Sequence, residues 1–164
     1  MSKATQPIPP GVSKLTPYLC IKNVAKAIEF YKQAFGAEEV TRMAMPDGRI
    51  MHAHLRFGDC TLFLSDEFPE HDCSNASPAT LGKAHATMHL FVEDVDTTFS
   101  TALKAGAKEV VPVADMFWGD RYGVIVDPFG QPWSIATHKE DLTSDEMRKR
   151  METACAPAQA AAKS

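Results

Sequence analysis

Three histidines are the residues of this sequence whose type and spacing are best suited to chemistry. His52 and His54 lie two positions apart in the alternating run MHAHLRF at 51–57, so both side chains fall on one face of a predicted strand. His89 lies in a second such run, HATMHLF at 85–91. Imidazole binds zinc, copper or iron and also acts as a general base. A histidine on a half-wet strand face is more often a hydrogen-bonded wall residue, so both interpretations stay open.

The elements that position these histidines occur twice in the sequence. Residues 14–40 read KLTPYLCIKNVAKAIEFYKQAFGAEEV, and residues 85–111 read HATMHLFVEDVDTTFSTALKAGAKEVV. The offset is about 71 residues, and a repeat of this kind indicates two similar structural units. Asn23 and Asp94 are predicted helix caps. The predicted order in each unit is βαβββ, with strands at 15–21, 38–45, 49–57 and 60–65 in the first, strands at 86–92, 108–113, 122–126 and 133–137 in the second, and helices at 24–35 and 95–105.

The repeat also sets the predicted domain boundaries. We expect two βαβββ modules of an α+β fold, joined by a polar linker and flanked by two arms. A Thr143-x-x-Glu146 capping box predicts one more helix after the second module. The predicted segments are a flexible Pro-rich arm at 1–13, the first module at 14–67, the linker at 68–84, the second module at 85–138, a C-terminal helix at 139–155 and a disordered tail at 156–164.

Composition excludes several classes of function. The chain has 164 residues, of which 45% are hydrophobic, which is enough for one sizeable core. Its formal net charge of −4 argues against nucleic acid or an anionic membrane as partner. No apolar run is long enough to span a bilayer, and the first residues do not resemble a secretory signal. The four cysteines contain no CxxC pair, so we expect free thiols and a cytoplasmic location.

Two tandem modules with these caps and turns resemble the vicinal oxygen chelate superfamily, which includes glyoxalase I, bleomycin-resistance proteins and extradiol dioxygenases. The segments IMHAHLRFGDCTLFLSDE at 50–67 and MFWGDRYGVIVDPFGQPW at 116–133 are similar to those of its PhnB-like branch. The resemblance implies a cup-shaped, partly open mixed β-barrel with helices outside. It also implies a small-molecule ligand and a homodimer.

The resemblance further locates the metal ligands of metal-using relatives. One ligand lies near the start of each module's first strand and one on each module's last strand. The corresponding residues here are Thr16, Phe63, Thr87 and Ser134. A phenyl ring offers no lone pair to a cation, and neutral hydroxyls bind divalent ions weakly. We therefore predict neither an inherited metal site nor another cofactor.

Strand alternation predicts which side chains line the cup. Trp118 is a predicted stacking wall and Arg121 a predicted clamp for a carboxylate or phosphate. In the alternative, an Asp120–Arg121 pair and Trp118 seal the module junction or a dimer contact. Met51 is predicted to lie on the opposite, helix-packed face. The complete predicted pocket is Thr16, Tyr18, His52, His54, Phe63, Thr87, His89, Phe91, Trp118, Arg121 and Ser134.

Three functions fit these observations. The first is a metal-independent binding protein that holds an apolar or aromatic ligand. The second is a glyoxalase-like lyase, isomerase or dioxygenase that uses His52 as catalytic base, or a displaced metal bound by His52, His54 and His89. The third is an interaction protein that uses the helix around 141–153 as a docking arm. The sequence leaves open the identity of the ligand and whether one chain or a dimer forms the cup.

Overall fold

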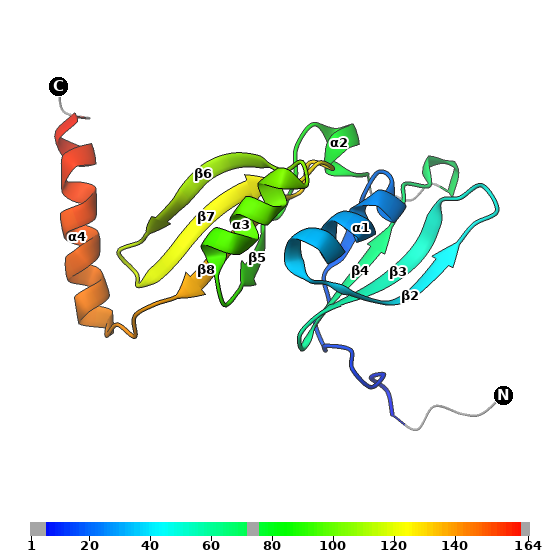
Figure 1. The fold of residues 1–164 in the computed structure, drawn as a ribbon, viewed down its shortest axis with the longest axis horizontal. Coiled ribbons are helices and arrows are strands. Elements are labelled where there is room, and N and C mark those ends of the chain that lie inside the picture. Colours follow the sequence, from blue (N-terminus) through cyan, green and yellow to red (C-terminus); the bar gives the residue numbers. More distant parts are fainter. Residues whose placement is uncertain (1–5, 72–75, 162–164) are drawn as a thin grey trace.

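The computed structural model describes residues 6–71 and 76–161, without the side chains of 71 and 155–161. It contains two four-stranded mixed sheets, each with one long helix on one face (Figure 1). The predicted α+β fold of two tandem βαβββ modules is therefore confirmed. The two sheets remain separate in the described part of the chain and do not close into a barrel.

The first module begins with a short strand that pairs in parallel with the last one. Its elements are β1 (Tyr18–Cys20), α1 (Val24–Phe35), β2 (Glu38–Ala44), β3 (Ile50–Phe57) and β4 (Cys60–Ser65), in the sheet order β1-β4-β3-β2. β1 runs parallel to β4, and the other neighbours are antiparallel. The Asn23 side chain accepts a hydrogen bond from the Lys26 N–H and so caps α1, as predicted.

The second module repeats this arrangement. Its elements are β5 (Met88–Phe91), α3 (Val95–Lys104), β6 (Lys108–Asp115), β7 (Asp120–Val126) and β8 (Pro132–His138), in the order β5-β8-β7-β6. β6 and β7 are longer than the predicted strands because pairing continues to Asp115 and Arg121. β1 and β5 are shorter than predicted, since only three and four of their residues form strands.

The connecting and C-terminal segments differ from the prediction. The linker contains a short 3-10 helix, η1 (Pro69–His71), and α2 (Pro78–Leu81). The C-terminal helix α4 spans Ser144–Ala161, so it begins later than the predicted 139–155 and extends past its end. Residues 1–5 of the predicted arm, Cys73 and 162–164 of the predicted tail lie outside the described residues.

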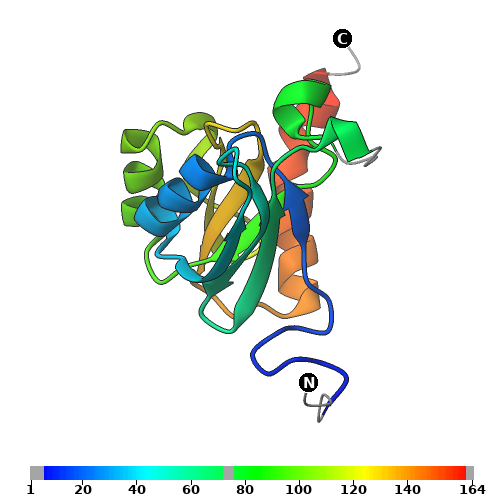
Figure 2. The same ribbon diagram turned by 90° about the vertical axis from the view of Figure 1, so that its right-hand side faces the viewer.

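The two long helices lie together on one side of the sheets. α1 and α3 contact each other and cover the same side of the molecule (Figures 1 and 2). Between the modules, the buried Tyr31 hydroxyl donates a hydrogen bond to Asp127 Oδ2 at 2.7 Å. Trp133 packs against Tyr31 and Phe35, with ring centroids 5.2 and 4.7 Å apart. The modules therefore share one core beneath these helices.

The opposite faces of the two sheets are directed to the same side of the molecule. In Figure 2 they lie away from α1 and α3, so they do not face one another across a closed space. The predicted position of Met51 on the helix-packed face is wrong, because 45% of its surface is exposed. The β2–β3 register shifts between Met43 and Ala44, which pair with His52 and Ile50, so Met51 lies at a bulge and leaves the alternation.

Candidate functional site

The open face of the first module carries a cluster of four rings, which we call the ring cluster: Tyr18, His52, His54 and Phe63. Phe63, on β4, is its centre. Its ring centroid lies 4.8 Å from that of His52, 5.2 Å from that of His54 and 5.9 Å from that of Tyr18, all edge-on. The parallel β1–β4 pairing places Tyr18 beside Phe63, and the antiparallel β3–β4 pairing places His54 on its other side.

The polar atoms of the ring cluster differ in their partners. His52 Nδ1 lies 3.1 Å from the Tyr18 hydroxyl. His54 Nε2 is buried and has no hydrogen-bond partner in the described structure. Burial lowers the pKa of His54, and the nearby His52 and Arg56 lower it further, so the imidazole is neutral near pH 7. The ring cluster therefore offers a neutral nitrogen beside an aromatic surface.

The second module carries a different set of side chains on its open face. His89 Nδ1 lies 2.7 Å from the Ser134 hydroxyl, and its ring stacks on Tyr122 at 6.2 Å. Phe91 meets His89 edge-on at 4.6 Å, and Trp118 meets Tyr122 at 5.5 Å. Tyr122 was not predicted for the pocket, although the alternation of β7 could have indicated it.

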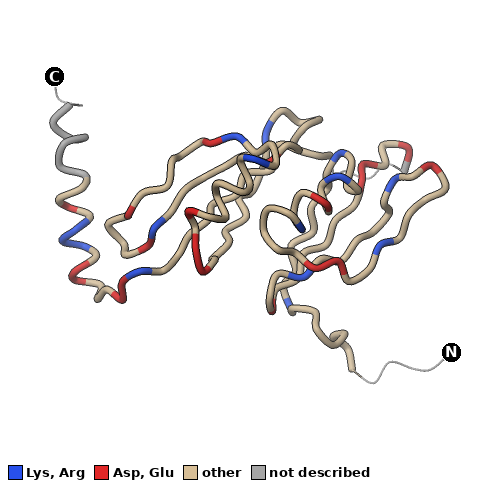
Figure 3. Tube along the Cα trace, viewed as in Figure 1, with Lys and Arg blue, Asp and Glu red and all other residues tan. Residues whose placement is uncertain are grey.

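Four of the six strands that carry these side chains lack charged residues. β1 and β4 in the first module, and β5 and β8 in the second, contain no Lys, Arg, Asp or Glu (Figure 3). β3, which carries His52 and His54, also contains Arg56, and this cation forms an ion pair with Glu38. An aromatic lining with few charges is typical of sites for apolar ligands.

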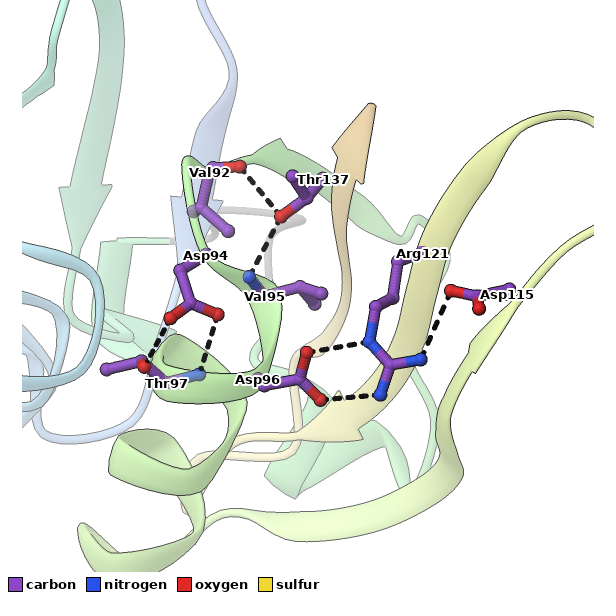
Figure 4. Close-up of polar contacts among 8 residues, drawn as sticks. All are labelled: Val92, Asp94, Val95, Asp96, Thr97, Asp115, Arg121 and Thr137. Carbon is purple, nitrogen blue, oxygen red and sulfur yellow. Dashed lines mark hydrogen bonds and ion pairs between the residues drawn. The ribbon is translucent and has the colours of Figure 1, made fainter. Parts of the chain in front are cut away.

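Arg121 is held by carboxylates of its own module. Its Nε and Nη2 donate to the two oxygens of Asp96 at 2.6 and 2.7 Å, and its Nη1 donates to Asp115 at 3.1 Å (Figure 4). Asp120 does not pair with Arg121, unlike in the predicted alternative. It accepts a hydrogen bond from Trp118 Nε1 at 3.0 Å, and its carboxylate lies 2.8 Å from His138 Nδ1. A clamp function for Arg121 would require these bonds to be exchanged for the ligand.

The four inherited metal positions do not fit a divalent cation. The Thr16 hydroxyl donates to the carbonyl of Ser13 at 2.9 Å, and Thr87 is exposed. Phe63 provides no donor atom, and the Ser134 hydroxyl is bonded to His89. A divalent ion would find no carboxylate or imidazole at any of the four positions.

The displaced metal site is not assembled within one chain either. Among the side chains that the structure describes, no group of three or more from His, Cys, Asp and Glu is placed to hold a metal ion. His89 contacts rings of its own module, whereas His52 and His54 contact Phe63 of theirs. The three histidines therefore divide between the two open faces.

Comparison with known proteins identifies the family. The model of the Glyoxalase/Bleomycin resistance protein/Dioxygenase superfamily matches residues 13–135. The chain belongs to this superfamily. An uncharacterized protein of Mycobacterium tuberculosis is 43% identical over 139 residues, which cover 84% of this chain and 81% of that protein.

Solved structures share the fold of this chain. TioX from Micromonospora sp. ML1 is 26% identical, with a TM-score of 0.60 over 77% of this chain and 98% of that one. A Bacillus cereus structure described as a putative 3-demethylubiquinone-9 3-methyltransferase, PhnB protein, is 18% identical, with a TM-score of 0.60 over 76% and 99% of the two chains. The second likeness concerns the fold alone. Among the described helices, none has the length and apolar character needed to cross a membrane.

Proposed function

We propose that this protein is a metal-independent small-molecule-binding protein of the glyoxalase and bleomycin-resistance type. The observation that carries the proposal is the ring cluster, in which Tyr18, His52 and His54 surround Phe63 on a face that α1 does not cover. Tyr18 keeps 55% of its surface exposed. The other three rings are half-buried. Rings placed together in this way favour an apolar or aromatic ligand that stacks on them.

The polar atoms of the ring cluster suit a ligand that carries one hydrogen-bonding group. The buried His54 Nε2 lacks a partner, and a buried polar atom gains stability when a partner is supplied. His52 and the Tyr18 hydroxyl form a second polar point 3.1 Å apart. We infer that these atoms orient the ligand while Phe63 supplies most of the contact area.

A second copy of the chain would complete the cup. The open faces of the two modules are directed to the same side, so one chain presents two half-sites rather than one enclosed site (Figure 2). We propose a homodimer in which the first module of one copy faces the second module of the other. His89, Phe91 and Ser134 would then line the cup opposite the ring cluster of the other chain.

Enzymatic function is the second candidate, and the contact between His52 and Tyr18 favours it. A hydroxyl beside an imidazole can orient a general base. In this version His52 removes a proton from the bound molecule in a lyase, isomerase or dioxygenase reaction. Glyoxalase and extradiol dioxygenase assays, with and without added zinc, nickel, manganese or iron(II), test it; turnover that is lost in His52→Ala would favour the enzyme.

We also propose a cytoplasmic location. Cys20 and Cys60, the two cysteines whose side chains the structure describes, form no disulfide bond. Proteins exposed to an oxidising compartment tend to carry disulfides. Fractionation of the native cell tests the location, and recovery from a secreted or periplasmic fraction would contradict it.

Binding of the fluorescent probe 8-anilinonaphthalene-1-sulfonate tests the ligand site. We expect the wild-type protein to bind the probe and Phe63→Ser, which copies Ser134, to bind it roughly fivefold more weakly or worse because the central ring is lost. Val110→Ser is the control, since it removes an exposed apolar side chain from β6, outside the ring cluster. Equal affinity in the wild type and Phe63→Ser would overturn the proposal.

A further inference from the structure

A cavity of about 380 Å³, which we call the junction cavity, lies between the two modules and borders the ring cluster. One wall is β1, whose Tyr18 also belongs to the ring cluster and lies 5.9 Å from Phe63, measured between ring centroids. The other walls are α2, the segment 83–86 that leads to β5, and Gln131 before β8. Cavities of this size hold small organic molecules. The junction cavity therefore offers room for a part of the ligand that extends beyond the rings.

The junction cavity and the ring cluster share one face of the first sheet. Tyr18 and Cys20 alternate with Leu19 along β1, and Leu19 packs against the buried core. Tyr18 and Cys20 consequently lie on the open face. Their register partners on β4 are Phe63 and Ser65. Figure 2 shows β1 and α2 on the side of the molecule away from α1 and α3. A ligand stacked on Phe63 thus has a path past Tyr18 into the junction cavity.

Hydrogen bonds of buried residues build the walls of the junction cavity. Gln131 is only 3% exposed, and its amide nitrogen donates to the carbonyl oxygens of Ala86 and Pro132 at 2.8 and 3.0 Å. On the side of α2, the fully buried Ser77 caps the helix, and its N–H donates to Glu67 at 2.7 Å. These bonds hold two walls of the cavity in place before a ligand binds, which lowers the entropic cost of binding.

The charge of the junction cavity is opposite to that of the whole chain. Lys83 and His85 line it, and no Asp or Glu is among the lining residues that the structure describes. The cavity at the start of α1, by contrast, is lined by Asp47, Asp66 and Glu67. Lys83 and His85 form no ion pair with any described residue. In a chain with a net charge of −4, the junction cavity is therefore suited to an anionic group.

We propose that the junction cavity binds the acidic end of the ligand, so that the ligand is an apolar or aromatic carboxylic acid. This inference rests on the proposed ligand site and names the class of its ligand. The apolar part stacks on the ring cluster, and the carboxylate lies in the junction cavity. There the Lys83 ammonium and the His85 ring donate hydrogen bonds to it. Pro78 and Leu81, which also line the cavity, contact the carbon atoms next to the carboxylate. One lysine and one histidine suit a single negative charge better than a doubly charged phosphate.

Fluorescence titration with 11-(dansylamino)undecanoic acid and its methyl ester tests the inference. The two probes share their rings and their chain and differ only in the charge of the end group. We expect the wild type to bind the acid about fivefold more tightly than the ester, and the difference to fall below about twofold in Lys83→Gln/His85→Gln. Both side chains are exposed, so the double variant should keep its fold. Lys104→Gln, which removes an exposed cation from α3, is the control and should keep the preference for the acid.

The outcomes of this titration separate the junction cavity from the ring cluster. An acid that binds the wild type no more tightly than the ester, or a preference that survives in Lys83→Gln/His85→Gln, would overturn the acid site and leave the ring cluster standing. Phe63→Ser should weaken the acid and the ester alike, because the rings of both probes stack on Phe63. If it weakens neither, or if the wild type binds neither probe, both proposals are overturned.

Leu81→Glu tests the place of the carboxylate by putting a negative charge at the wall of the junction cavity. Leu81 is 44% exposed, so the substitution should not disturb the core. We expect the affinity for the acid to fall about fivefold or more through repulsion of like charges, and the affinity for the ester to stay within about twofold of wild type. Val110→Glu, on the exposed surface of β6, is the matched control. Equal losses for the acid in the two variants would contradict an acid site at the junction cavity.

Discussion

The two modules share one topology but secure their helices differently. In the first, Asp66 accepts hydrogen bonds from the N–H groups of Asn23, Val24 and Ile50, at 2.8, 3.0 and 2.7 Å. In the second, the hydroxyl of Thr137 takes the corresponding place, accepts from the Val95 N–H at 2.8 Å and donates to a carbonyl (Figure 4). The same helix start is thus held by a buried carboxylate in one module and by a hydroxyl in the other.

The modules also divide the space between helix and sheet differently. In the first module Ile28 of α1 and Ala53 of β3 are fully buried. In the second, Phe99 takes the place of the isoleucine and Gly123 that of the alanine. A Cβ on Gly123 would lie 2.7 Å from Phe99 Cε2. A larger residue on the helix is therefore paired with a smaller residue on the sheet. The two modules thus keep a similar total side-chain volume at this position.

The largest expected effect comes from giving the first module the cap of the second. In Asp66→Thr, one hydroxyl replaces a carboxylate that accepts from three buried or half-buried amides. We expect the free energy of unfolding to fall by about 2–4 kcal/mol, because two amides lose their acceptor. Urea unfolding followed by circular dichroism measures it. Thr137→Ser, which keeps the hydroxyl, is the control, and a loss in Asp66→Thr no larger than in this control would contradict the difference between the caps.

Gly123→Ala tests the division of volume. The added methyl group meets Phe99 and Val113, which lie 2.7 and 3.0 Å from its position. We expect a loss of about 1–3 kcal/mol in the free energy of unfolding, since overpacking strains a dense core. Phe99→Ile/Gly123→Ala copies the pair of the first module and should recover at least half of that loss. A single variant as stable as the wild type would show that the site has spare room.

Tyr31→Phe tests the buried hydrogen bond between Tyr31 of the first module and Asp127 of the second. Burial raises the pKa of Tyr31 well above its usual range, so its hydroxyl remains a donor to Asp127 at all ordinary pH values. Its loss should lower the free energy of unfolding by about 1–2 kcal/mol, because Trp133 still donates to the same carboxylate. Tyr18→Phe removes an exposed hydroxyl instead and should cost less. Similar losses in the two variants would argue against a special role for the junction.

The smallest expected effect is a change of protein stability with pH. It arises from the residues at the end of the last strand of each module. Glu67 accepts from the Ser77 N–H after the first module, whereas His138 lies between Asp120 and Asp141 after the second. Hydrogen bonds to Asp120 and then to Asp141 raise the pKa of His138 above its usual range. The stabilisation is therefore complete below about pH 6.5, the ordinary pKa of histidine, and is lost as the pH rises through the raised value.

Histidine titration by NMR, together with urea unfolding of the wild type and His138→Gln at pH 5.5 and pH 9, measures this effect. The wild type should be the more stable protein at pH 5.5, and the difference should shrink at pH 9. A stability difference between the wild type and His138→Gln that grows with pH would contradict the expected direction of the effect. A pKa of His138 at or below that of the unfolded chain would also contradict the contact with the two aspartates.

The sequence predicted the modules well because their signals are local. Helix caps at Asn23 and Asp94 depend on residues within one turn, and strand alternation places His52 and His54 on one face whatever the rest of the chain does. The partners of Arg121 could not be predicted, because Asp96 lies 25 positions away on α3 and is brought near only by packing of α3 on β7. The predicted face of Met51 was wrong because a β-bulge interrupts the alternation of side chains, and no sequence pattern marks this bulge.

The sequence by itself determined the two βαβββ modules and the residues able to form the ring cluster. It also determined that Thr16, Phe63, Thr87 and Ser134 offer a cation neither carboxylate nor imidazole. Side-chain type and short-range periodicity decide these properties. Only the tertiary structure decided that His89 stays apart from His52 and His54, and that the open faces lie side by side. These outcomes depend on how α1 and α3 pack and on the Tyr31–Asp127 bond across the junction. Such contacts join residues nearly one hundred positions apart, so no local pattern specifies them.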